Sequence, residues 1–167
     1  PNSLDIPEID TIEWFYENKY IKEIVLEEGI TSFFMNSTEC SSLERIVIPS
    51  TLTPNRYGNF GTFNDSPLLK FDVSSNNKNF STMQDGAILL SKDKKKIYAW
   101  PSASGKIKIP DEVENFDWLI FYKNKNIEEI TFSKNMEHYT DLSCEGVKTL
   151  IIPEGVTHIG ERAFYGC

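Results

Sequence analysis

The chain has 167 residues, of which 40% are hydrophobic and 25% charged, as expected for one globular domain with a sizeable core. Its formal net charge of -8 argues against a nucleic-acid partner, which would require a basic surface. No stretch approaches the ~20 apolar residues of a membrane-spanning helix, and PNSLDIPEID at the start lacks the basic and apolar regions of a signal peptide. Three cysteines are too few for a small disulfide-bonded scaffold.

Seven stretches of the sequence share one apolar pattern. In each stretch the fourth and sixth places are apolar, as are Ile46 and Ile48 in LERIVIP and Leu150 and Ile152 in VKTLIIP. The stretches begin at residues 1, 21, 43, 68, 104, 127 and 147, so their starts are 20, 22, 25, 36, 23 and 20 residues apart. A period of this length is typical of a solenoid built from small stacked units.

Each unit is predicted to begin with a short strand. The two apolar places are separated by one other residue, which is the period of a strand with one face turned inward. A proline such as Pro49 or Pro110 then ends the strand, because it cannot donate a backbone hydrogen bond. In the last unit, VTHI predicts a second extended segment with Val156 and Ile159 inward, and ERAFYGC predicts a helical turn that buries Phe164.

The units are expected to share one continuous interior, with each strand paired in parallel with the strand of the next unit. The inward residues should then form a single row: Leu26, Ile48, Val73, Ile109, Phe132 and Ile152. The predicted fold is a β-rich α/β solenoid over residues 1–167. It has a parallel sheet of short strands on one side and short helical or irregular turns on the other.

Small residues that can hydrogen-bond to the backbone recur three places before the start of the next unit. They are Asn18, Cys40, Asp65, Asn124, Cys144 and Cys167. At one fixed place per turn, such residues are expected to form a buried ladder that satisfies loop amides. The cysteines are therefore predicted to be buried thiols without a redox role, although a Cys144–Cys167 disulfide between neighbouring turns remains an alternative.

The one long step, of 36 residues, contains an inserted segment near residues 84–101. Asp85-Gly86 is a turn signal, and the β-prone segments Ala87–Leu90 and Ile97–Trp100 flank the polar SKDKKK. This pattern predicts a β-hairpin with a lysine-rich tip. The tip either holds an acidic ligand or is a solvated turn whose lysines discourage edge pairing.

The third and fifth places of each strand should point outward and form the surface to which a partner could bind. Along this face Glu23 is expected to lie next to Arg45, and Lys106 next to Glu129, so that opposite charges pair across strands. The alternative is that these side chains only stabilise the sheet. The predicted partner-binding residues are Glu23, Arg45, Lys70, Lys106, Glu129, Val25, Val47, Asp72, Lys108 and Thr131. Tyr57, Trp118 and Tyr122 are candidate aromatic anchors.

Signals for catalysis are weak. The two histidines, His138 and His158, occupy equivalent outward places in neighbouring units, but no carboxylate or cysteine in register completes a metal site. Adjacent acids such as Glu128 and Glu129 point to opposite faces of a strand and cannot form an acid–base pair. No phosphate-binding glycine loop or nucleophile motif is present. We expect no enzymatic activity and no cofactor.

The unit LIIPEGVTHIGERAFYGC resembles the repeat of BspA-type leucine-rich repeat proteins, whose pattern is close to IxIPxxVTxIGxxAFxxCxxL. The match is nearly complete at the C-terminus, good at 107–124, and in register but degraded elsewhere; the Ala-Phe signature is missing at 31–42 and 53–64. The resemblance implies a leucine-rich-repeat right-handed superhelix. It also implies an extracellular location on the surface of a bacterial or protozoan cell, and adhesion to host or matrix proteins.

The expected function is therefore a non-catalytic binding module for another protein. The alternative is a structural spacer that displays another domain of a larger surface protein. Because the sequence stops after Cys167 without a visible cap, we expect it to be a fragment of a longer protein. The ligand and the oligomeric state are left open.

Overall fold

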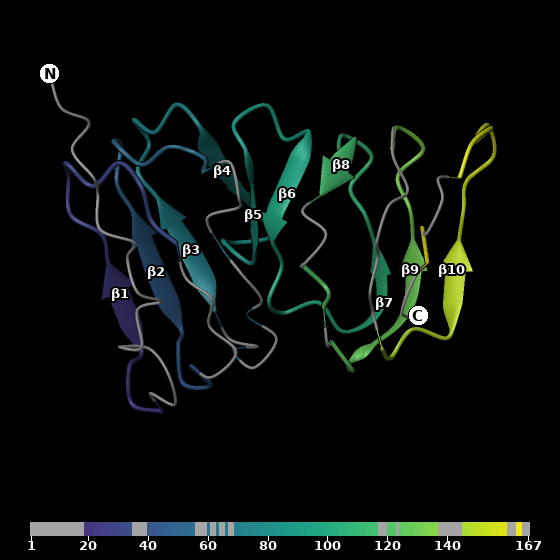
Figure 1. The fold of residues 1–167 in the computed structure, drawn as a ribbon, viewed down its shortest axis with the longest axis horizontal. Coiled ribbons are helices and arrows are strands. Elements are labelled where there is room, and N and C mark those ends of the chain that lie inside the picture. Colours follow the sequence, from purple (N-terminus) through teal and green to yellow (C-terminus); the bar gives the residue numbers. More distant parts are fainter. Residues whose placement is uncertain are drawn as a thin grey trace, which may run out of the picture.

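The computed structural model describes residues 19–34, 40–55, 60, 63, 66, 69–116, 120–122, 124–136, 145–159 and 163–164. These residues form ten strands, which are spread along the long axis of the molecule, with β1 near one end and β10 near the other (Figure 1). The strands are β1 (Glu23–Val25), β2 (Arg45–Ile48), β3 (Lys70–Val73), β4 (Phe80–Met83), β5 (Ile88–Ser91), β6 (Lys96–Ala99), β7 (Gly105–Lys108), β8 (Asn115–Phe116), β9 (Ile127–Thr131) and β10 (Thr149–Ile151).

Six of the seven predicted strands pair in parallel with the predicted register inside two three-stranded sheets, and the strand of the unit that begins at residue 1 lies outside the described residues. In the first sheet β2 lies between β1 and β3, and Arg45 is opposite both Glu23 and Lys70. In the second sheet β9 lies between β7 and β10, and Glu129 is opposite both Lys106 and Thr149. The apolar alternation sets this register, because a slip of one residue would turn every inward side chain toward water.

The expectation of one unbroken parallel sheet is wrong. A third sheet, in the order β4-β5-β6-β8, lies between the two parallel sheets (Figure 1). The predicted hairpin is present as the antiparallel pair β5 and β6, but β4 pairs with β5 as well and β8 pairs in parallel with β6. Val73 and Ile109 are therefore not neighbours, and the predicted row of inward residues is two rows. The first consists of Leu26, Ile48 and Val73. The second consists of Ile109, Phe132 and Ile152.

The inserted hairpin is a wall inside the protein, buried on both faces. Leu90 and Ile97 belong to the apolar cluster of the C-terminal half, whereas Leu89 and Tyr98 belong to the cluster of the N-terminal half. Leu90 pairs with Ile97 and Leu89 with Ala99, so Tyr98 is an extra residue at a bulge. The interior is consequently two clusters on either side of this wall instead of one continuous core.

Asn124 has the buried ladder role that its spacing predicts. Its Oδ1 accepts hydrogen bonds from the backbone N–H groups of Asn126 (2.8 Å) and Ile127 (3.2 Å). Its Nδ2 donates to the carbonyl of Ala103 in the preceding turn, at 3.0 Å. One side chain thus satisfies backbone groups of two successive turns.

Cys40 is also buried as expected, but its partner in the next turn is Ser66. The Ser66 hydroxyl donates to the Cys40 carbonyl, and the Ser66 side chain is almost fully buried. Asp65, which was predicted for this place, lies outside the described residues, as do Asn18, Cys144 and Cys167.

Asn77 is a ladder residue that the repeat pattern missed, because it lies within the long step between residues 68 and 104, where no unit start follows it three places later. Its Nδ2 donates to the carbonyls of Pro49 (2.6 Å) and Leu52 (3.2 Å), and its Oδ1 accepts from the N–H groups of Asn79 and Phe80, both at 2.8 Å. Its position three residues before the β4 strand matches the spacing of Asn124 before β9.

No helix occurs among the described residues, so the α/β class and the helical turns are not supported. Ala163 and Phe164 of the predicted helical turn lie in a turn, and the rest of that segment is outside the described residues. In the described part of the return segments, Ser66 and Asn124 each bond to a carbonyl of the preceding turn. In the part of the chain that the structure covers, no helix is both long and apolar enough to cross a bilayer.

Candidate binding surface on the strand face

The two parallel sheets carry the ten predicted partner-binding residues on their outward faces. The first strip, on β1 to β3, consists of Glu23, Val25, Arg45, Val47, Lys70 and Asp72. The second strip, on β7, β9 and β10, consists of Lys106, Lys108, Glu129, Thr131, Thr149 and Ile151. Lys70 and Lys106 are not neighbours, because the central sheet separates the strips. The predicted surface is therefore two patches instead of one.

Charges on the first strip are paired with one another. Arg45 bonds to Asp72 and to Glu23, one on each neighbouring strand, and Lys70 bonds to Asp85 in the turn after β4. The carboxylate of Asp72, and secondarily that of Glu23, raises the pKa of Arg45. The ammonium group of Lys70 lowers the pKa of Asp85. The predicted Glu23–Arg45 pair is thus confirmed, as part of a three-residue network with Asp72.

The second strip has a sparser set of charges. The predicted Lys106–Glu129 pair is present at 3.2 Å, and Lys108 bonds to Asp111 in the next turn, also at 3.2 Å. Thr131 and Thr149 place hydroxyl groups beside these pairs. Two lysines, one glutamate and two hydroxyl groups therefore share this strip.

Exposed apolar side chains occur at the outer end of each strip. Val25 on β1 is 50% exposed, and Ile151 on β10 is 42% exposed. Tyr20, just before β1, is 90% exposed. The repeat pattern did not single out Tyr20, although it immediately precedes the unit that starts at Ile21. An exposed aromatic ring has the area and rigidity of a binding anchor.

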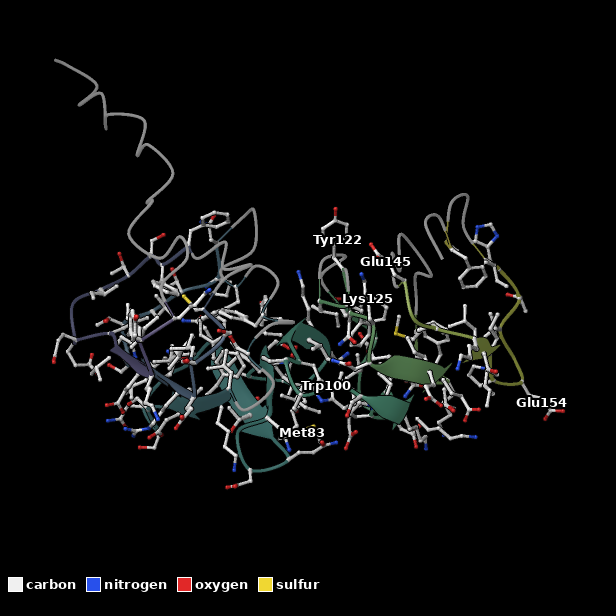
Figure 2. All side chains as sticks on the ribbon, turned by 90° about the horizontal axis from the view of Figure 1, so that it is seen from below. Met83, Trp100, Tyr122, Lys125, Glu145 and Glu154 are labelled. Atoms are coloured by element: carbon white, nitrogen blue, oxygen red, sulfur yellow. The ribbon has the colours of Figure 1, made fainter. Side chains whose placement is uncertain are left out.

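Of the three aromatic anchors named from the sequence, the structure describes Tyr122, which does not lie on this face. Tyr57 and Trp118 are outside the described residues. Tyr122 is half-buried, and Figure 2 shows it on the loop side, away from the strands, together with Lys125 and Glu145. These last two residues form an ion pair at 3.7 Å. The loop side therefore offers a separate surface that can serve as a control for experiments on the strips.

Of the two histidines considered for a metal site, the structure describes one. His158 is exposed as predicted, while His138 lies outside the described residues, so their expected proximity is not established. Within the described ranges, no three His, Cys, Asp or Glu side chains gather as a metal site would require. Ile159, expected to point inward, is instead exposed.

The hairpin tip is a tight, well-bonded turn. The Asp93 carboxylate accepts from the Ser91 hydroxyl (2.6 Å) and the Lys95 N–H (3.1 Å), and these bonds, the hydroxyl first, lower the pKa of Asp93. Lys95 pairs with Glu114 at 2.6 Å. The Nζ of Lys96 lies 5.1 Å from the centre of the Tyr98 ring, a cation–π contact.

The sequence was compared with models of known protein families, and one family matches. The model of the BspA type leucine rich repeat region matches residues 2–84 and 95–167 in six copies, where the sequence pattern predicted about seven units. The segment outside the match, residues 85–94, covers the turn after β4, strand β5 and part of the hairpin tip. Comparison with curated proteins gives no match.

Two solved structures are similar to this chain. A leucine-rich repeat protein from Eubacterium ventriosum has a TM-score of 0.51 and 23% identity, over 77% of this chain and 41% of that one. A leucine rich cell surface protein from Faecalibacterium prausnitzii has a TM-score of 0.51 and 17% identity, over 93% of this chain and 54% of that one. These likenesses concern the fold, and the chain spans about half or less of the length of either protein. Because the family model matches nearly the whole sequence, the chain belongs to the BspA-type leucine-rich repeat family.

Proposed function

We propose that this chain is a non-catalytic, protein-binding module of a cell-surface repeat protein, and that it binds host or matrix proteins through the two strips. The observation that carries the proposal is the arrangement of outward side chains in register on adjacent strands. Neighbouring strands lie about 4.8 Å apart, so each strip presents charged, hydroxyl and β-branched groups at fixed intervals. A regular array of this kind suits an extended protein surface better than a small molecule, which would need a concave pocket.

A surface location is part of the proposal. It is supported by family membership and by the similarity to the Faecalibacterium prausnitzii structure, which is described as a cell surface protein. Membership in a repeat family also supports a binding role over a catalytic one, because solenoids commonly bind partners along extended surfaces.

The second strip is the better candidate for direct contact. On the first strip Arg45 is already shared by two carboxylates, so a partner would have to compete with existing ion pairs. On the second strip Thr131, Thr149 and the exposed Ile151 leave hydroxyl and apolar groups open to a partner. Exposed ion pairs contribute little by themselves, so affinity should depend mainly on these neutral groups.

Binding can be tested by biolayer interferometry against immobilised fibronectin, fibrinogen, laminin and collagen. Thr131→Glu combined with Ile151→Glu should weaken any binding by roughly tenfold or more, because two charges would be placed in the contact. The matched control is Lys125→Gln with Tyr122→Glu on the loop side, which has the same change in net charge and should leave binding unchanged. Circular dichroism verifies that each variant is folded.

The spacer alternative is favoured by the fully paired charges of the first strip, which act as sheet stabilisation. It predicts that no matrix protein binds and that the strip variants change only stability. Equal loss of binding in the strip and loop-side variants would also contradict a role for the strips.

A further inference from the structure

The strongest unassigned feature is a cluster of lysines at the β5–β6 turn, which we call the lysine turn (Ser91–Lys96). The backbone N–H of Lys92 donates to the carbonyl of Asn79 at 2.8 Å, and this bond brings the chain next to Lys78 alongside the turn. In the described part of the chain, Lys78, Lys92 and Lys94 have no acidic partner, and all three are exposed. The charge is concentrated here although the whole chain has a net charge of -8.

The only acid inside the turn is directed toward the turn itself. Asp93 accepts hydrogen bonds from the Ser91 hydroxyl and the Lys95 N–H, so its carboxylate stabilises the turn. It forms no ion pair with Lys92 or Lys94 in the described structure. Lys96 N–H donates to the Ser91 hydroxyl at 2.9 Å, and Lys94 N–H donates to the Ser91 carbonyl at 2.9 Å. These bonds fix the backbone, so a ligand would not have to order the turn when it binds.

Lys94 has a backbone conformation that lysine rarely adopts. Its φ is +64°, a left-handed value that glycine or asparagine adopts more easily. A strained residue held in place by its surroundings is a reason to look for a functional side chain. Here the residue that bears the strain also adds a positive charge to the cluster.

Protection of a sheet edge does not explain these lysines. Lysines on an exposed edge strand prevent it from pairing with another chain. The lysine turn, however, joins β5 and β6, and both strands have neighbours on each side in the order β4-β5-β6-β8. The edge strand β4 (Phe80–Met83) itself contains no charged residue.

We propose that the lysine turn, with Lys78, is a docking site for a short acidic segment of a polypeptide. This site is separate from the strips and goes beyond the function proposed above. A compact cluster of carboxylates matches the small extent of the basic patch. A long polyanion such as a nucleic acid would extend past the patch and be repelled by the acidic remainder of the molecule.

The test uses the whole chain and a fluorescein-labelled short polyglutamate peptide, with binding measured by fluorescence anisotropy at about 20 mM and about 150 mM NaCl. Unmodified protein should bind, and more weakly at the higher salt concentration. The triple variant Lys78→Gln/Lys92→Gln/Lys94→Asn should bind roughly tenfold or more weakly. The matched control Lys22→Gln/Lys125→Gln/Lys148→Gln has the same change in net charge at other sites and should retain affinity within about twofold.

Stability measurements separate binding from folding. Lys94→Asn relieves the left-handed strain, so it should keep or raise the thermal midpoint while weakening peptide binding. Absence of binding at low salt, equal losses in the triple variant and its control, or binding that falls only with the midpoint would each overturn the proposal. Tighter binding of duplex DNA or inorganic polyphosphate than of the peptide would overturn the assignment to an acidic polypeptide.

Discussion

The parallel sheets and the central antiparallel sheet bury their side chains in different ways. In β2 the inward residues Ile46 and Ile48 are fully buried, while outward Arg45 is exposed to water. In β5 three consecutive residues, Ile88, Leu89 and Leu90, are all fully buried. A strand that separates two cores loses the alternation of burial that a one-sided strand has, because both of its faces meet apolar side chains.

The two cores also differ in composition. The N-terminal cluster is rich in phenylalanine. The ring of Phe60 packs edge to face against those of Phe71 and Phe80, with ring centroids 5.6 and 6.1 Å apart. The C-terminal cluster is mainly aliphatic around Ile107, Ile130 and other branched residues. The central wall must therefore fit a different shape on each face. The N-terminal and C-terminal halves are therefore not equivalent, although they share one repeat pattern.

Truncation on each face of the wall should give the largest effects. Leu89→Ala and Leu90→Ala each remove a fully buried side chain and should lower the free energy of unfolding by about 2–5 kcal/mol. Leu89→Ala should mainly reduce hydrogen-exchange protection in β2, and Leu90→Ala in β9, because the two residues belong to different clusters. An equal loss of protection in both halves after either substitution would show that the cores are not separate.

A glycine at the junction of the first sheet and the wall should be nearly as sensitive. Gly86 has a φ of +85°, and a Cβ there would lie 2.8 Å from the carbonyl oxygen of Phe71. Its own carbonyl accepts a hydrogen bond from Phe71 N–H at 2.8 Å. Gly86→Ala should therefore cost about 2–4 kcal/mol of the free energy of unfolding in a urea titration.

The control for this substitution is Gly155→Ala. Gly155 has a φ of +93°, but nothing lies within 4 Å of a Cβ at this position. It should show only the backbone strain, about 1–2 kcal/mol. If the two variants were equally destabilised, the close approach of Gly86 to β3 would have no energetic consequence.

Loss of a ladder amide should have a smaller effect on stability. Asn124→Ala would leave the N–H groups of Asn126 and Ile127 and the Ala103 carbonyl without their partner, at a cost of about 1–3 kcal/mol. Asn135→Ala is the exposed comparison, since Asn135 bonds to the Asp111 carbonyl at the surface. Its thermal midpoint should fall less than that of Asn124→Ala, and a reversed order would contradict the role of burial.

Acid should slightly lower the thermal stability of the first turns, around Glu28, and of the junction between the first sheet and the central sheet, around Asp85. Bonds from the backbone and hydroxyl of Ser50 lower the pKa of Glu28 from its ordinary 4.5, and Lys70 lowers the pKa of Asp85 from its ordinary 3.8. Because the folded pKa is below the unfolded one, this stabilisation is present at neutral pH and is lost as the pH falls through the folded value. The thermal midpoint should therefore drop below about pH 4.5, the upper end of this window.

The comparison variant for acid is Glu28→Gln together with Asp85→Asn. At neutral pH it should have a slightly lower midpoint than the natural sequence. It should also lose less of its midpoint between about pH 6 and about pH 3, because two of the responsible carboxylates are gone. An unchanged acid response would mean that other carboxylates, such as Asp93, dominate it.

Local spacing in the sequence was enough to predict the strands of the two parallel sheets and their register. The alternation at Ile24, Ile46 and Ile130 placed β1, β2 and β9, and the unit starts aligned Glu23 with Arg45 and Lys106 with Glu129. It also identified the family, the hairpin and the buried places of Cys40 and Asn124. These features depend on local spacing, which the chain carries whatever surrounds it.

The position of the inserted segment depends on contacts between parts of the chain that are distant in the sequence. The local sequence of β5 and β6 specifies a hairpin, but its apolar residues are compatible with either an external flap or an internal wall. The choice depends on whether two neighbouring turns leave their inner faces open to it, and that is a contact between segments distant in the sequence. The split of the binding surface into two strips, and of the interior into two cores, follows from this one placement.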